Sequence, residues 1–269
     1  MLQKIEEINE FKDRFKLKFD VFRLTNYAFN DFLMEILANG TAYVVGGFLR
    51  DIANGSLSRD LDMMVDIDQE LLEDILKRSQ LKYKFNRMSG VKISLLDSEV
   101  DLWTIDNNWA FRTDVVNRNE NYIIERIADG CFFNYDSLVI NVNKGNFIHV
   151  RNYNECVTEK TLDILRKNDL YKKKNPTVEA NILRAFFLAK KFELSFSENC
   201  TTYLARSIIN LKLQHGSLFR RLETFLEKYP KYSSVISIDD VATMSESAIK
   251  DSRIIEDRKS IDNQQKFNF

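Results

Sequence analysis

The chain has 269 residues, 44% of them apolar and 29% charged, with a formal net charge of −1. A protein that grips a long duplex usually has a large basic excess, so any nucleic-acid contact is expected to be local or short. The apolar stretches are shorter than the ~20 residues that span a bilayer, and the first residues lack a signal-peptide core, so a cytoplasmic protein is expected.

The first half of the chain alternates short apolar runs with turn residues. Apolar side chains at helical spacing over 21–38, followed by Asn39-Gly40, predict one helix. The segments after it predict a strand at TAYVV (41–45), a short helix at FLRDIAN (48–54) and a strand at LDMMVDI (61–67).

Two strand pairs are predicted next. VKISLL (91–96) and EVDLWTI (99–105) form a hairpin if Asp97-Ser98 is the turn. The second pair is SLVINV (137–142) with NFIHV (146–150).

From about residue 159 the apolar spacing becomes helical. The predicted helices are TLDILRKN (161–168), VEANILRAFFLAKKF (178–192) and TTYLARSIINLKL (201–213). Strands followed by helices predict an α+β fold: a head domain with a mixed sheet at 1–157 and a helical neck domain at 158–244. Residues 245–269 are predicted to be a polar C-terminal tail, partly helical or mobile.

The segment VVGGFLRDIANGSLSRDLDMMVDI (44–67) carries the chemical signal. Gly46 and Gly47 follow a strand, where the lack of side chains lets the backbone approach a triphosphate. Strand side chains alternate faces, so Asp60 and Asp62 project to one side with alpha-carbons ~6.6 Å apart. Closely spaced carboxylates suit two Mg²⁺ ions, or Mn²⁺, in phosphoryl transfer.

A third carboxylate is expected on a neighbouring strand. Asp101 is the candidate metal ligand, Glu99 on the same face is the alternative, and a solvent-facing hairpin residue is the plain structural interpretation. Arg50 either contacts phosphate or pairs with Asp51 or Asp60.

The segment resembles the head-domain signature of the CCA-adding enzyme and bacterial poly(A) polymerase family, within the polymerase-β-like nucleotidyltransferase superfamily. FNYDSLVIN (133–141) resembles the family's Phe-Thr-Ile-Asn-Ala-Leu segment, and ILRAFFLAKKF (182–192) resembles its Leu-Arg-Ala-x-Arg-Phe-Ala helix. The resemblance covers about residues 40–195 and implies Mg²⁺-dependent transfer of a nucleoside monophosphate. The family's Gly-Gly, Arg-Asp and Asp-x-Asp match Gly46, Gly47, Arg50, Asp51, Asp60 and Asp62.

The sequence departs from the family where a sugar is read. The family's Arg-Arg-Asp falls on Gly130, Cys131 and Phe132, so the carboxylate expected at the ribose 2′-hydroxyl is missing. One hypothesis is that Phe132 disfavours that hydroxyl and the enzyme prefers deoxynucleotides. The other is that the alignment has slipped and Phe132 belongs to the core.

The base-reading motif is also altered. The family's Glu-Asp-x-x-Arg aligns with Thr177, Val178 and Asn181. Asn181 is predicted to pair with adenine through its amide, which favours dATP or ATP, and a capping or surface Asn is the alternative. Arg184, in the helix that resembles the family's, is predicted to be a further nucleotide-binding residue.

A short neck without a long basic body argues against housekeeping CCA addition. The outline is similar to the nucleotidyltransferases of bacterial antiphage systems, including the Hailong type, which implies short DNA oligomers that act on a membrane effector. Synthesis there starts on a tyrosine of the C-terminal tail, whereas Phe267 and Phe269 have no hydroxyl. The alternatives are transfer to the 3′ end of a tRNA or another short single-stranded nucleic acid, toxin-like transfer to tRNA or a protein hydroxyl, and an inactive head that only binds.

Overall fold

The computed structural model describes residues 2–56, 60–86, 89–143, 147–165, 178–215 and 218–266, without the side chains of 215, 218, 219 and 258–266. Residue contacts divide the chain into two compact units, Met1–Thr158 and Glu159–Phe269. The head boundary expected from the sequence, after residue 157, falls next to this division.

The first unit is built on a seven-stranded mixed sheet with the order β3-β4-β5-β2-β1-β6-β7. Strands β2 and β5 run parallel, and the other neighbouring strands pair antiparallel. The strands are β1 (Thr41–Val45), β2 (Asp60–Asp66), β3 (Lys82–Phe85), β4 (Val91–Ser94), β5 (Glu99–Thr104), β6 (Val139–Asn141) and β7 (Ile148–His149).

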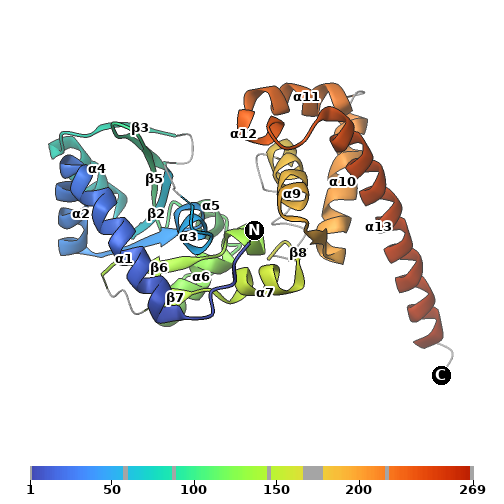
Figure 1. Cartoon of the computed structure of the whole chain (residues 1–269), viewed down its shortest axis with the longest axis horizontal. Helices are drawn as coiled ribbons and strands as arrows, with labels where there is room; N and C mark the ends of the chain where they lie inside the picture. Colours follow the sequence, from blue (N-terminus) through green and yellow to red (C-terminus); the bar gives the residue numbers. More distant parts are fainter. Residues whose placement is uncertain are drawn as a thin grey trace. The chain divides into compact units, whose positions relative to one another are not determined.

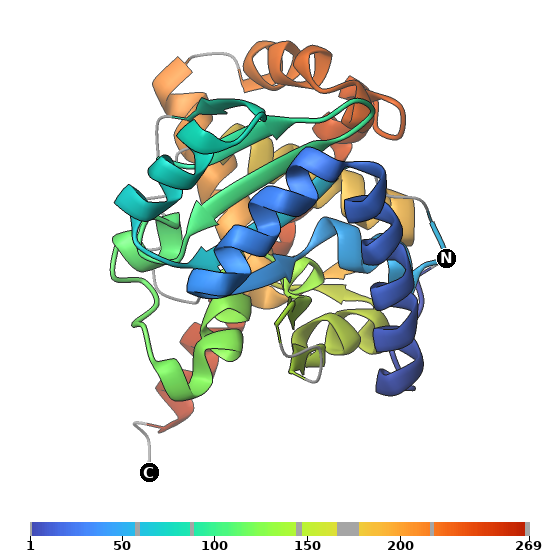
Figure 2. The same cartoon turned by 90° about the vertical axis from the view of Figure 1, so that its left-hand side faces the viewer.

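Helices pack on this sheet and at its ends (Figure 1). Figure 2 shows α1 and α2, in dark and medium blue, lying across one face of the sheet. The helices are α1 (Ile8–Thr25), α2 (Tyr27–Asn39), α3 (Gly47–Ala53), α4 (Gln69–Arg78), α5 (Trp109–Arg112), α6 (Ile123–Asp129) and α7 (Arg151–Glu159), with 3-10 turns η1 (Glu120–Tyr122) and η2 (Asn134–Asp136).

Side-chain alternation gives the sheet two different faces. On one face Leu61, Met63 and Val65 of β2 are fully buried beneath helices that include α2 and α4. The other face carries Asp60 and Asp62, and farther along β2 it is covered by α5 and α6, which pack in one hydrophobic cluster with Tyr43 and Met64. The two aspartates therefore lie on the face opposite α2 and α4.

The single helix predicted over 21–38 is wrong, because the chain breaks between α1 and α2 at Asn26. Asn26 has φ −124° and ψ 71°, outside the helical range. Its side-chain amide donates to the carbonyl of Phe22, and the Thr25 hydroxyl donates to the carbonyls of Val21 and Phe22. These local side-chain bonds compete with helix continuation.

Both predicted strand pairs are present, and so are the strands at β1 and β2. The first hairpin turns one residue earlier than predicted, at Leu96-Asp97, with the Leu95 amide donating to the Ser98 carbonyl over 2.9 Å. This register sets Lys92 opposite Asp101. A turn at Asp97-Ser98 would have set Ser94 there.

The second unit consists mainly of helices, with α13 lying along α10 (Figure 1). A helix predicted from residue 161 is wrong at its start, because Thr161 and Leu162 form strand β8, which pairs parallel with β9. The elements are β8 (Thr161–Leu162), α9 (Val178–Phe192), β9 (Ser195–Phe196), α10 (Glu198–His215), α11 (Leu218–Lys228), α12 (Pro230–Ser233) and α13 (Ile238–Lys266).

Helix α13 continues through residue 245, where the sequence places the start of a polar tail. In the part of the chain that the structure describes, no helix is both long and apolar enough to cross a membrane.

Candidate active site

Adjacent strands align the predicted carboxylates on one face of the sheet. In the parallel pairing of β2 with β5, Asp62 lies beside Asp101 and Asp60 lies beside Glu99. Neighbouring strands are ~4.8 Å apart, and residues two apart on one strand are ~6.6 Å apart. Asp60, Asp62 and Asp101 therefore share one face of two adjacent strands, with Glu99 as a fourth acid on that face, and their role as metal ligands stays a prediction.

The turn after β1 lies next to Asp62. Gly46 has φ +66°, a backbone conformation that a residue with a side chain adopts only under strain. Its amide donates to the Leu138 carbonyl over 2.9 Å. A β-carbon placed on Gly47 would lie 3.7 Å from Asp62 Oδ2, and one on Gly46 would lie 4.0 Å from the same oxygen. The two glycines thus keep the space beside this carboxylate free of side chains.

Arg50 lies on α3, directly after this turn, and is largely buried. Its guanidinium forms an ion pair with Asp136, and its Cζ lies 4.5 Å from the centre of the Tyr135 ring. The sequence prediction offered phosphate, Asp51 or Asp60 as partners of Arg50, and it missed Asp136. The only available signal was the resemblance of residues 133–141 to a family segment, because the two residues are 86 positions apart.

Lys92 is a second residue that sequence reasoning missed. Its Nζ lies 2.8 Å from Glu99 Oε2 and 3.5 Å from Asp101 Oδ2. The Lys92 hydrogen bond lowers the pKa of Glu99, whereas burial raises the pKa of Asp101 despite Lys92. Within the described residues, no three His, Cys, Asp or Glu side chains lie close enough together to form a metal-binding group.

Comparisons with known proteins point to one fold. A CCA-adding enzyme with ATP matches with a TM-score of 0.60 and 20% identity over 94% of this chain, and a CCA-adding enzyme with CTP matches with 0.59 and 20% over 92%. The Thermotoga maritima CCA-adding enzyme complexed with tRNA matches with 0.58 and 19% over 85%. The chain has the fold of the CCA-adding enzymes.

This chain spans about half the length of those enzymes, since it covers 56%, 55% and 50% of their chains. No protein-family profile and no curated protein matches the sequence. The fold shared with these enzymes accounts for the mixed sheet followed by helices.

Phe132 follows α6 and precedes Tyr135 and Asp136, which contact Arg50. Its half-buried ring packs edge-on against the buried Phe133, with ring centres 4.9 Å apart. Phe132 is therefore neither a fully buried core residue nor a freely exposed one. Its predicted position at the sugar stays a prediction.

The predicted base-reading residues lie in the second unit. Asn181 is buried on α9 and donates its amide to the Tyr203 hydroxyl over 3.4 Å, so it is neither the surface residue nor the cap that the plain interpretation offered. Arg184 is half-buried on the same helix. Thr177 and the terminal Phe267 and Phe269 lie outside the described residues.

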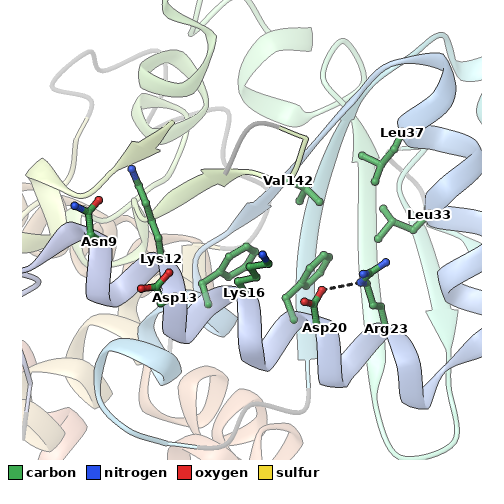
Figure 3. Close-up of a pocket in the computed structure, with 11 residues that line it drawn as sticks. Asn9, Lys12, Asp13, Lys16, Asp20, Arg23, Leu33, Leu37 and Val142 are labelled. Atoms are coloured by element: carbon green, nitrogen blue, oxygen red, sulfur yellow. Dashed lines mark hydrogen bonds and ion pairs between the residues drawn. The ribbon is translucent and has the colours of Figure 1, made fainter. Parts of the chain in front are cut away.

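A cavity of about 560 Å³ lies between α1, α2 and Val142. Figure 3 shows its mixed lining, with charged side chains such as Lys12 and Asp20 along α1 and apolar ones such as Leu33 on α2. Because α2 covers the face opposite the aspartates, this cavity is separate from the candidate active site.

Proposed function

We propose that this chain is a metal-dependent nucleotidyltransferase that transfers a nucleoside monophosphate from a nucleoside triphosphate to a hydroxyl group. The observation that carries the proposal is the position of Asp62, which lies between the Gly46–Gly47 turn and Asp101 on the next strand. A turn without side chains beside paired carboxylates suits phosphoryl transfer with divalent cations.

Asp60, Asp62 and Asp101 would hold Mg²⁺, or Mn²⁺ in its place. Their donor set fits, since Mg²⁺ prefers carboxylate oxygens and the glycines leave room for further oxygen ligands from phosphates. Bound divalent cations would neutralise the triphosphate and lower the pKa of the attacking hydroxyl.

The protein's own residues then position the substrate. Gly46 and Gly47 would admit the triphosphate close to the backbone. Arg50, held by Asp136 and Tyr135, would fix the turn and present positive charge behind it. Fixed geometry of this kind contributes to the rate because less ordering is left to occur during the reaction.

The acceptor and the nucleotide are separate parts of the proposal. CCA-adding enzymes of this fold have been solved with ATP, CTP and tRNA, which supports a nucleoside triphosphate substrate and a nucleic-acid 3′ end as acceptor. The test is to incubate the protein with Mg²⁺ and each α-labelled NTP or dNTP, with and without short RNA and DNA. Label on added RNA supports the 3′-end activity, and label on the protein indicates a toxin-like or self-modifying enzyme.

Preference for deoxynucleotides, with dATP first, is the finer proposal. It rests on Phe132 standing where the family has the sugar-facing carboxylate. We expect dATP to be incorporated in preference to ATP, and Phe132→Asp to shift the ratio towards ATP. A clear preference of the unaltered protein for ATP would refute this assignment.

Synthesis of short DNA oligomers as an antiphage signal is the pathway-level proposal. The products expected are labelled oligomers formed from dATP without any added nucleic acid. Incorporation only on added RNA would exclude this pathway and leave RNA 3′-end transfer in place.

A further inference from the structure

Lys92 stands at the edge of the carboxylate group and faces two acids at once. It extends from β4 on the same sheet face as Asp101, which lies opposite it in the antiparallel register. The ammonium lies 2.8 Å from Glu99 and 3.5 Å from Asp101. The side chain is 29% exposed, so the ion pairs are partly shielded from water.

The charges across this face follow one row. Lys84 on β3 is paired in register with Lys92, Lys92 with Asp101, and Asp101 with Asp62. Asp101 is therefore placed between a cation on one side and a second carboxylate on the other. A divalent cation shared by Asp62 and Asp101 would compete with Lys92 for the Asp101 carboxylate, because both are cations within reach of it.

We propose that Lys92 is a positioning residue that holds Asp101 until a divalent cation takes its place, while Glu99 keeps Lys92 at the edge of the site. This inference rests on the proposed function, because it requires Asp60, Asp62 and Asp101 to bind metal. The shorter contact to Glu99 supports the direction of the exchange: Lys92 can release Asp101 and still keep a carboxylate partner. Lys92 would thereby set the metal concentration at which the site fills.

The experiment is a titration of the full chain with Mn²⁺, with free Mn²⁺ read from its electron paramagnetic resonance signal and no nucleotide present. Lys92→Met removes the competing cation and keeps the aliphatic stem, so we expect Mn²⁺ to bind about tenfold more tightly. Lys84→Met is the matched control. It removes the same charge from the same face one strand farther away, and we expect less than about a twofold change.

A double-mutant cycle separates partner exchange from simple charge. Glu99→Gln leaves Lys92 with Asp101 as the remaining acid of the two, so Lys92 is expected to hold Asp101 more firmly. We therefore expect Mn²⁺ to bind about threefold more weakly than to the unaltered chain. In the Lys92→Met background the same change is expected to have almost no effect. If Glu99→Gln weakens binding equally in both backgrounds, Glu99 acts by charge or as a ligand, and the exchange is refuted.

Two further variants keep the result interpretable. Asp62→Asn tests the metal site itself: Mn²⁺ binding that does not change with Asp62→Asn contradicts the proposed function. Binding that depends on Asp62 but is the same in Lys92→Met and Lys84→Met contradicts only the role of Lys92. An arginine at position 92 can pair with both acids, so Lys92→Arg is expected to keep the Mn²⁺ affinity of the unaltered chain. The melting temperature of each variant checks that it folds.

Discussion

Two adjacent glycines at the candidate active site differ in what they require. Gly46 has φ +66°, whereas a β-carbon on Gly47 would meet its neighbours at 3.4 Å or more, an ordinary contact. A glycine is therefore needed at position 46 because of the backbone conformation. At position 47 it is needed to keep the space beside Asp62 free of a side chain.

This difference predicts that one alanine variant loses stability and the other loses affinity for the nucleotide. Gly46→Ala is expected to lower the free energy of unfolding by about 1–3 kcal/mol, because a side chain strains that conformation. Gly47→Ala is expected to fold with almost unchanged stability and to raise the KM for the nucleoside triphosphate. Urea unfolding and transferase kinetics on both variants check this pair. Equal loss of stability would contradict it.

The buried ion pair gives a second residue-scale prediction. Asp136→Asn leaves the Arg50 guanidinium, 11% exposed, without its carboxylate, so the free energy of unfolding is expected to fall by about 3 kcal/mol. Asp74→Asn breaks an ion pair with Lys77 on the surface and is expected to change little. A small effect of Asp136→Asn in chemical denaturation would show that Arg50 is held by other contacts.

Single elements were predictable where their signals are local. The strands β1 and β2 and helix α9 follow from apolar spacing, and the alternation of β5 already put Asp101 on the face opposite Val100 and Leu102. The break at Asn26 was missed because hydrogen bonds from two side chains, Thr25 and Asn26, decide it within an apolar pattern that continues.

Cross-strand partners were harder to predict than the carboxylates themselves. Lys92 depends on the register of the hairpin, and a turn shifted by one residue exchanges Lys92 for Ser94 opposite Asp101. Asp136 depends on the approach of a segment 86 residues from Arg50. Such contacts come from the tertiary fold and leave no periodicity in the sequence.

The start of α13 gives an element-scale prediction with a pH dependence. Asp240 accepts hydrogen bonds from Lys190 first and then from the Ser237 amide and hydroxyl, and these bonds lower its pKa from 3.8 to about 2. Because the folded pKa is the lower one, the stabilisation is complete above about pH 4 and disappears as the pH falls towards 2.

Asp240→Asn is therefore expected to lower the stability at pH 7 by about 1 kcal/mol. The difference from the unaltered protein is expected to shrink as the pH is lowered from 5 to 3. Denaturant unfolding across this range is the measurement, and a difference that grows at acid pH would contradict the assignment.

At the scale of the whole molecule, the chain joins a sheet-based unit, which carries the acidic residues, to a helical unit. Its fold is that of CCA-adding enzymes about twice its length. A net charge of −1 gives little general attraction for nucleic acid, so we expect affinity for an acceptor to depend on local contacts.

The central claim is that Asp62 and its neighbours gather divalent cations around a triphosphate. The most direct measurement is Mg²⁺-dependent release of pyrophosphate by the unaltered chain and by Asp62→Asn, with Asp97→Asn in the exposed hairpin turn as the matched substitution. We predict a loss on the order of a hundredfold or more for Asp62→Asn and none for Asp97→Asn, at equal melting temperatures. Full release by a folded Asp62→Asn protein would contradict the account.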